Sequence, residues 1–184
     1  MNRIILKDLF RYEGERCKSI KMQLRYLLFT PSFRYIYFFR KTQLAKNKLT
    51  RLFWHYLLRR WMLKTGIQIP WKTKIGEGLR IVHFGHIVVN PGTIIGKNFN
   101  ISQGVLIGNS LGKKQGVPVI GDNVCVNANA IIVGNCRIGD NVLIAPGAFV
   151  NFDVPDNSIV IGNPGKIITR EDSPTDKYIV YPIK

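Results

Sequence analysis

The sequence predicts a mostly β protein, a parallel β-helix preceded by an N-terminal helical region. The first observation is an aliphatic residue at every sixth position, a period that neither a helix (3.6) nor an alternating strand (2) produces. The second is a small or aliphatic residue four positions after each of these. The third is a break in composition at Gly66. The sixth-position residues are Ile120, Val126, Ile132, Ile138, Ile144 and Val150.

The same period extends towards the N-terminus through Ile107, Ile101, Ile95 and Val89. An earlier run is offset by two residues, which predicts a kink or small insertion near residues 88–90; that run is Ile87, Ile81 and Ile75. The period breaks again at residues 109–118, where we expect a loop outside the solenoid. Such loops commonly carry function. The solenoid is expected from about Ile75 to about Lys166.

The repeats and two motifs resemble the hexapeptide-repeat acyltransferases with a left-handed parallel β-helix, most of all their serine acetyltransferase-like branch. The resemblance covers roughly residues 66–168. It rests on the repeats, on the histidine motif at 81–90 (IVHFGHIVVN) and on the Gly-Asn-Pro motif at 162–164. It implies a homotrimer with an acyl-CoA groove between adjacent solenoids. It also implies acetyl-CoA as co-substrate and no metal.

Charge is spread unevenly along the 184 residues. Residues 1–66 hold 16 of the 27 basic and 3 of the 11 acidic residues, a net charge of +13, and 13 of the 20 aromatic residues. Residues 67–184 carry a net charge of only +3. We therefore expect a basic aromatic helical region at 1–66, the acyltransferase domain at 67–168 and a C-terminal tail at 169–184.

The N-terminal region predicts helices within 1–29, after Thr30-Pro31, and around Leu49–Trp61. The last of these carries an apolar stripe, with Arg51, His55 and Arg59 on the opposite face. One hypothesis is a helical cap on the first coil or on another subunit. The other is peripheral contact with an anionic membrane. Nucleic acid is disfavoured because no recognised binding motif is present.

The three cysteines show no metal or redox spacing; they are Cys17, Cys125 and Cys136. Without a secretory signal, unpaired cysteines suggest a cytoplasmic setting, here at the inner face of the cytoplasmic membrane if residues 1–66 contact lipid. Charges interrupt every apolar run before the roughly 18–20 residues that a membrane span needs. We expect no transmembrane segment.

Two of the three histidines lie close together, at His83 and His86. Histidine can take a proton from a hydroxyl as that hydroxyl attacks a thioester. The resemblance places His83 at the family's catalytic histidine, whereas the family does not require His86. Zinc would need a third ligand, and the solenoid has no third histidine. Gln68, His86, Asn90 and Gln103 are the expected substrate-binding residues.

On the donor side, the segment 103–108 matches the family's "Q-x-V-x-(I/L)-G" coil. The backbone near Gly108 is the candidate for positioning the thioester and stabilising its oxyanion. Small residues would let the pantetheine arm lie against the solenoid wall, and the Gly-Asn-Pro motif resembles the family's terminal CoA-contacting turn. The expected cofactor-binding residues are Gly108, Ala128, Ala145, Gly147, Asn163 and Pro164.

Two departures from serine acetyltransferases concern the acceptor. Gln68 stands where those enzymes have an aspartate that pairs with the histidine, and Gly116-Val117 replace an Arg-His pair. We therefore expect acetylation of a sugar hydroxyl on a capsular or exopolysaccharide, or on its lipid-linked precursor, with His83 as general base. The alternatives are serine O-acetylation and a catalytically silent β-helix used for assembly or membrane recruitment.

Overall fold

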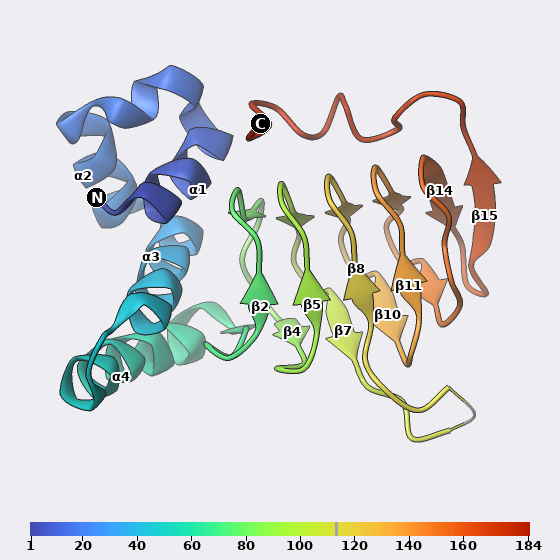
Figure 1. Cartoon of the computed structure of the whole chain (residues 1–184), viewed down its shortest axis with the longest axis horizontal. Coiled ribbons are helices and arrows are strands. Elements are labelled where there is room, and N and C mark those ends of the chain that lie inside the picture. Colours follow the sequence, from blue (N-terminus) through green and yellow to red (C-terminus); the bar gives the residue numbers. More distant parts are fainter. Residues whose placement is uncertain (113) are drawn as a thin grey trace.

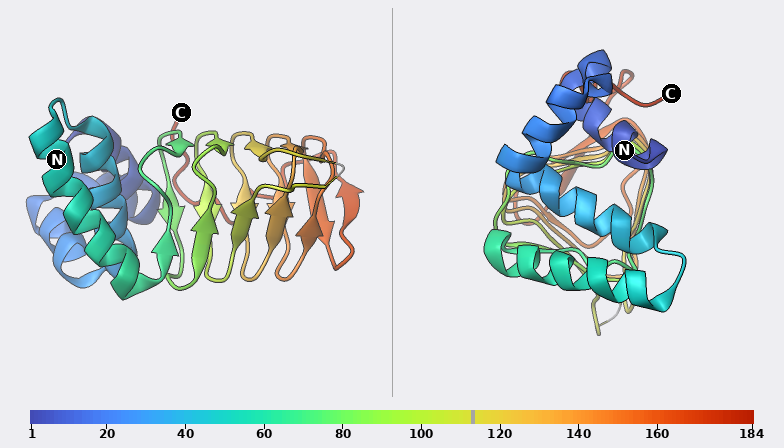
Figure 2. Two further views of the ribbon diagram at one scale, coloured as in Figure 1. Left: turned by 90° about the horizontal axis from the view of Figure 1, so that it is seen from below. Right: turned by 90° about the vertical axis from the view of Figure 1, so that its left-hand side faces the viewer.

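The computed structural model describes residues 1–112 and 114–184. A helical region stands at one end of a long three-sided solenoid, and the C-terminal segment runs back along the solenoid towards the helices (Figures 1 and 2). The helices are α1 (Arg3–Glu13), a 3₁₀ turn (Gly14–Lys18), α2 (Ile20–Phe29), α3 (Pro31–Leu44) and α4 (Lys48–Thr65). The expected helices are thus present, and the one after Thr30-Pro31 is α3.

Short parallel strands form the three faces of the solenoid. Sheet A contains β1 (Ile67–Gln68), β4 (Ile87–Val89), β7 (Leu106–Gly108), β10 (Ile131–Val133) and β13 (Phe149–Val150). Sheet B contains β2 (Lys74–Ile75), β5 (Ile94–Ile95), β8 (Val119–Ile120) and β11 (Arg137–Ile138). Sheet C contains β3 (Arg80–Ile81), β6 (Asn100–Ile101), β9 (Cys125–Val126), β12 (Leu143–Ile144), β14 (Ser158–Ile161) and the antiparallel β15 (Lys166–Thr169).

The core confirms the period of six. Every sixth-position residue points into the solenoid, with Val126, Ile132, Ile144 and Val150 completely buried. Stacking the coils places side chains of equivalent repeat positions above one another and covers the apolar edge that one coil alone would expose. The regular repeat therefore determines the straight shape on which the candidate site is built.

The two-residue offset in the early repeats has a different location from the one predicted. Ile81 pairs with Ile101 and Val88 with Leu106. Val88 is therefore seven residues after Ile81, whereas its partner Leu106 is only five residues after Ile101. The two extra residues lie in the turn 82–86, between β3 and β4, and not near residues 88–90. We call residues 82–86 the histidine bulge, because the insertion pushes His83 and His86 outwards.

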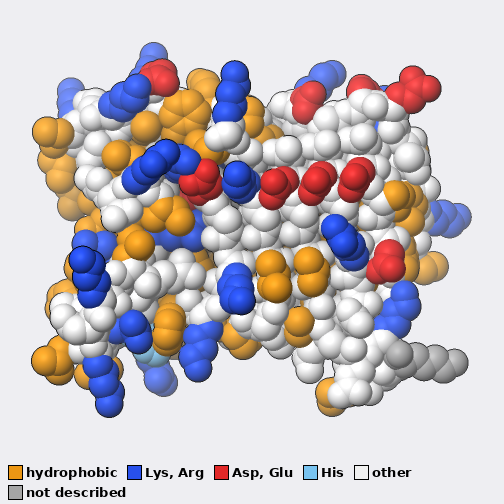
Figure 3. Space-filling view, in the orientation of Figure 1, with side chains coloured by type: hydrophobic (Ala, Val, Ile, Leu, Met, Phe, Trp, Pro, Cys, Tyr) orange, Lys and Arg blue, Asp and Glu red, His pale blue; other side chains and the backbone are white. Residues whose placement is uncertain are grey.

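Asparagines and aspartates line the edge where sheet B turns into sheet C. Asn98, Asn123 and Asn141 adopt left-handed backbone angles, with φ of 55–56°, and their side-chain amides form a ladder with distances of 2.9–3.0 Å. Aspartates of successive coils cap backbone N–H groups beside them and form the row of acidic side chains in Figure 3. The C-terminal tail lies against this edge, where Ile183 N–H donates to Asn98 Oδ1 at 2.8 Å.

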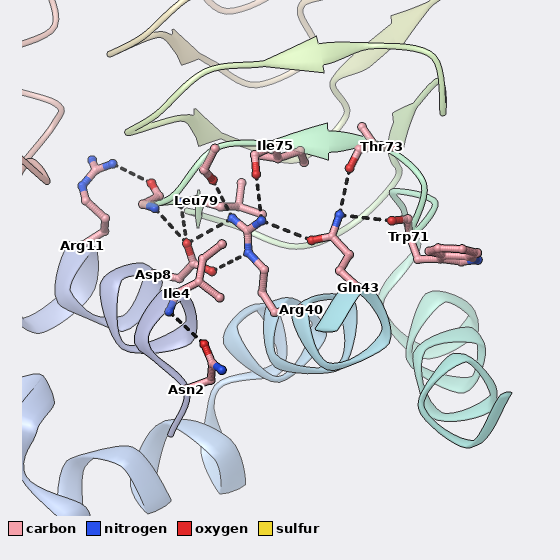
Figure 4. Close-up of polar contacts among 12 residues, drawn as sticks. Asn2, Ile4, Asp8, Arg11, Arg40, Gln43, Trp71, Thr73, Ile75 and Leu79 are labelled. Atoms are coloured by element: carbon pink, nitrogen blue, oxygen red, sulfur yellow. Dashed lines mark hydrogen bonds and ion pairs between the residues drawn. The ribbon is translucent and has the colours of Figure 1, made fainter. Parts of the chain in front are cut away.

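The helical region caps the open end of the solenoid. The first coil leaves backbone groups without a strand partner, and buried side chains from α1 and α3 satisfy them (Figure 4). Asp8 Oδ1 accepts from the N–H groups of Gly78 and Leu79, both at 2.9 Å. Arg40 donates to the Ile75 carbonyl at 2.8 Å and forms an ion pair with Asp8 at 2.8 Å. These contacts support the cap hypothesis.

The apolar stripe of α4 does not form the main contact with the first coil. Leu58 is the completely buried residue of this helix, whereas Leu49 is 80% exposed and Tyr56 is 58% exposed. The opposite face, with His55 and Arg59, borders a hollow beside β1. Within the described residues, no helix has the length and apolar character needed to cross a bilayer.

Candidate active site

His83 lies exposed in the histidine bulge, at the edge where sheet C turns into sheet A. The bulge is held between the end of α4 and the next coil. A Cβ on Gly66 would lie 2.8 Å from the backbone nitrogen of His86, so glycine is needed for this close approach. On the other side, Gly104 N–H donates to the Gly85 carbonyl at 3.0 Å. His86 itself has φ of 48° and its side chain is exposed.

The predicted acyl-donor residues follow the same edge, which we call the C–A edge. It consists of the turns 82–86, 102–105, 127–130 and 145–148. The turn 162–165, between β14 and β15, stacks on its end, where Phe149 N–H donates to the Gly162 carbonyl at 3.0 Å. Backbone bonds join successive turns: Asn129 N–H donates to the Gln103 carbonyl at 3.0 Å, and Gly147 N–H donates to the Ala128 carbonyl at 2.9 Å. Ala145, Asn163 and Pro164 continue the line. The structure therefore brings His83, His86, Gln103 and these small residues to one edge.

Gly108 and Asn90 lie on the other side of sheet A, where it turns into sheet B. Gly108 ends β7 in register with Val133, and Asn90 Oδ1 accepts from the Gly92 N–H at 2.9 Å. Strands of three residues span about 10 Å. Within one protomer, Gly108 is therefore separated from His83 by the width of sheet A, and these two predicted catalytic residues do not meet.

The expected loop at 109–118 leaves the solenoid between β7 and β8 and folds back as a small hairpin. Ser110 and Gly116 form an antiparallel bridge, and Asn135 N–H donates to the Lys114 carbonyl at 2.9 Å. A Cβ on Gly92 would lie 3.4 Å from the Val117 side chain. Lys113, within the predicted loop, lies outside the described residues. The loop thus borders the Gly108 side of sheet A.

Gln68 projects from β1 into a hollow of about 350 Å³ under α4. His55, Arg59, Met62 and Leu63 complete its lining. His55 and Arg59 were predicted to share a helix face but were not among the predicted site residues. Their i, i+4 spacing, on a helix that leads directly into β1, could have indicated that they lie together near Gln68.

The cysteines are buried, and burial is the main reason that their thiol pKa values are raised. The pKa of Cys125 and that of Cys136 both rise to about 11, and the pKa of Cys17 is also raised by burial. All three are therefore protonated near neutral pH, which makes them weak nucleophiles. Across residues 1–112 and 114–184, no group of three or more His, Cys, Asp or Glu side chains is placed to hold a metal ion.

Comparison with known proteins agrees with the repeats and the fold. Residues 118–151 match the family model "Bacterial transferase hexapeptide (six repeats)". A serine acetyltransferase from Synechococcus elongatus is 33% identical over 163 residues, covering 88% of this chain and 66% of that protein. One from Staphylococcus aureus is 41% identical over 109 residues, covering 58% of this chain and 51% of that protein. This chain therefore spans between half and about two thirds of these relatives.

A solved structure shows the same architecture. The crystal structure of Neisseria gonorrhoeae serine acetyltransferase in complex with serine superimposes with a TM-score of 0.71 at 29% identity. The match covers 89% of this chain and 67% of that one. The fold is the left-handed parallel β-helix with N-terminal helices. The chain belongs to the hexapeptide-repeat transferases. Within that family it belongs to the serine acetyltransferase-like branch.

These relatives correct the expected acceptor: a polysaccharide or lipid-linked glycan is wrong, because the matched proteins are serine acetyltransferases. Gln68, Val117 and the basic aromatic N-terminus were the features that favoured a glycan. The Gln68 side-chain oxygen can still accept a hydrogen bond from an imidazole N–H. Part of the N-terminal aromatic composition serves the cap: Tyr35 OH donates to the Ile69 carbonyl at 2.8 Å. Gln68 and the N-terminal composition therefore do not identify a glycan.

Proposed function

We propose that this protein transfers the acetyl group of acetyl-CoA to the hydroxyl of L-serine. The observation that carries the proposal is the histidine bulge on a serine acetyltransferase-like scaffold. A two-residue insertion raises an exposed histidine out of an otherwise regular edge. That edge continues as a line of small residues, suited to an extended thioester cofactor.

In the proposed mechanism His83 removes the proton from the serine hydroxyl as its oxygen attacks the thioester carbonyl. The tetrahedral intermediate then collapses, the C–S bond breaks, and the imidazolium returns the proton to the departing CoA thiolate. Gln68 is the candidate to orient the imidazole through its side-chain oxygen. Without a negative charge, it stabilises the imidazolium less than a carboxylate would. Acid–base assistance of this kind contributes about 10²–10⁴-fold.

We further propose a homotrimer, because within one protomer the proposed base is far from the backbone expected to bind the thioester. His83 and Gly108 occupy opposite edges of sheet A. In a trimer the C–A edge of one solenoid can face the Gly108 edge and the 109–118 loop of its neighbour. Gln103, Ala128, Ala145, Gly147, Asn163 and Pro164 would then line the donor groove. In this arrangement residues 67–168 are the transferase domain, which residues 1–66 cap.

Release of CoA from acetyl-CoA, followed with a thiol reagent, tests the activity. We expect release that depends on L-serine and saturates with it, with O-acetylserine as product by mass spectrometry. D-serine and L-alanine are the matched controls, because L-alanine lacks the attacking hydroxyl. Serine-independent release at the same rate, or no O-acetylserine, would refute the proposed function.

We also propose that the helical region touches anionic lipid surfaces, on the strength of α2. None of the residues in this helix is buried; Ile20 is 75% exposed and Phe29 is 77% exposed, among basic neighbours. We expect the protein to sediment with phosphatidylglycerol vesicles and to be released by salt. Leu24→Glu/Phe29→Glu should abolish binding, whereas Ile168→Glu at the far end of the solenoid should not. Equal sedimentation of all three proteins would exclude this surface.

A further inference from the structure

We propose that the hollow between α4 and the first coil, lined by His55, Arg59, Met62, Leu63 and Gln68, binds the carboxylate of the amino-acid acceptor. We call it the α4 groove. Arg59 is the principal ligand and His55 the second. This inference rests on the proposed function and adds residues that determine which acceptors are used.

The α4 groove lies beside the histidine bulge. Gln68 forms one wall, and Gln68 is paired in register with Val88 of β4, just after the histidine bulge. Gly66 joins α4 to β1 and lies against the backbone of His86. The groove and the bulge are therefore on either side of the same junction. The proposal therefore places the carboxylate of the acceptor in the groove and its hydroxyl towards the bulge.

The α4 groove is basic and, within the described part of the chain, holds no acidic side chain. Arg59 is exposed, and among the described residues no hydrogen-bond or ion-pair partner of its guanidinium is found. No aspartate or glutamate is among the residues that line the hollow. A second hollow of about 150 Å³ shares His55 and adds Lys48, Arg51, Leu52 and Trp71. Figure 3 shows basic side chains gathered over the region of α4.

The chemistry of the lining favours a carboxylate. A guanidinium binds carboxylate oxygens through charge-assisted hydrogen bonds, often two in parallel. His55 and Arg59 are one helical turn apart, so both reach the same face of α4. The helix is fixed by the completely buried Leu58 and by its capping Gly66, so these ligands are held on a rigid element. A neutral sugar hydroxyl would gain nothing from such charge.

Steady-state kinetics of Arg59→Gln test the inference. We expect the KM for L-serine to rise about 10–100-fold, the loss of one charge-assisted contact, with the KM for acetyl-CoA unchanged. Arg59→Lys should recover part of the loss. Arg60→Gln is the matched control, because Arg60 is exposed on the same helix but does not line the groove. Neither substitution removes a buried side chain, so both variants should fold.

L-Serinamide, which lacks the carboxylate, separates recognition from indirect effects. The wild type should prefer L-serine over L-serinamide by a factor similar to the effect of Arg59→Gln, and the variant should lose this preference. If the wild type acetylates serine and Arg59→Gln keeps the preference, the groove is not the carboxylate site although the proposed function stands. If the wild type does not acetylate serine at all, the proposed function fails and this inference fails with it.

Discussion

Replacing His83 with alanine is expected to lower kcat for serine acetylation by about 10²–10⁴-fold. The variant loses the group that takes the hydroxyl proton and returns it to the CoA thiolate. Its KM for acetyl-CoA should change little, since the line of small residues along the C–A edge remains. Because His83 is exposed and its side chain makes no hydrogen bond within the described residues, the melting temperature should stay near that of the wild type.

Phe84→Ala provides the matched control for this measurement. Phe84 follows His83 in the same bulge and is 49% exposed, so its removal disturbs the turn without removing a base. We expect it to retain most of the wild-type kcat. Equal activity of His83→Ala and wild type would remove His83 from the chemistry. Equal losses in both variants would instead mean that the shape of the bulge, and not its histidine, is what matters.

The solenoid could be predicted from the sequence because every coil needs an apolar side chain at the same inward position. A residue such as Ile132 must be aliphatic in every coil, so the period appears directly in the sequence. The histidine bulge was harder to place. The repeats show that two residues are inserted, but only the pairing of Ile81 with Ile101 and of Val88 with Leu106 shows where.

The helical region was only partly predictable, because its contacts are not periodic. Hydropathy favoured the stripe with Leu49 and Tyr56 as the packing face of α4. The structure leaves these residues exposed and uses Leu58 instead. The contact between Asp8 and Arg40 could not be predicted from the sequence, because the two residues are far apart in the chain. Both bind backbone groups at the open end of the first coil. The α4 groove was missed for the same reason.

The buried ion pair between Asp8 and Arg40 leads to the second prediction. Arg40→Met is expected to lower the free energy of unfolding by about 3–5 kcal/mol, measured by urea denaturation at pH 7. It leaves the Asp8 carboxylate buried without its cation and the carbonyls of Ile75 and Gly76 without their donor. Lys7→Met is the matched control, because the Lys7–Glu77 pair at 2.6 Å is partly exposed and should contribute at most about 1 kcal/mol.

The pH dependence shows whether the loss arises from an uncompensated charge. Burial raises the pKa of Asp8 above its ordinary value of 3.8, and Arg40 with the N–H groups of Gly78 and Leu79 opposes that rise. Removing Arg40 raises the pKa of Asp8 further, so the folded variant binds a proton more tightly than the unfolded chain. The stability of the Arg40→Met variant is then lost as pH rises from about 3.8 through the folded-state pKa of Asp8.

The cost of Arg40→Met should therefore shrink as pH falls. The cost of Asp8→Ala, which has no carboxyl at this position, should lack that recovery. A pH-independent cost of Arg40→Met would assign the loss to packing alone.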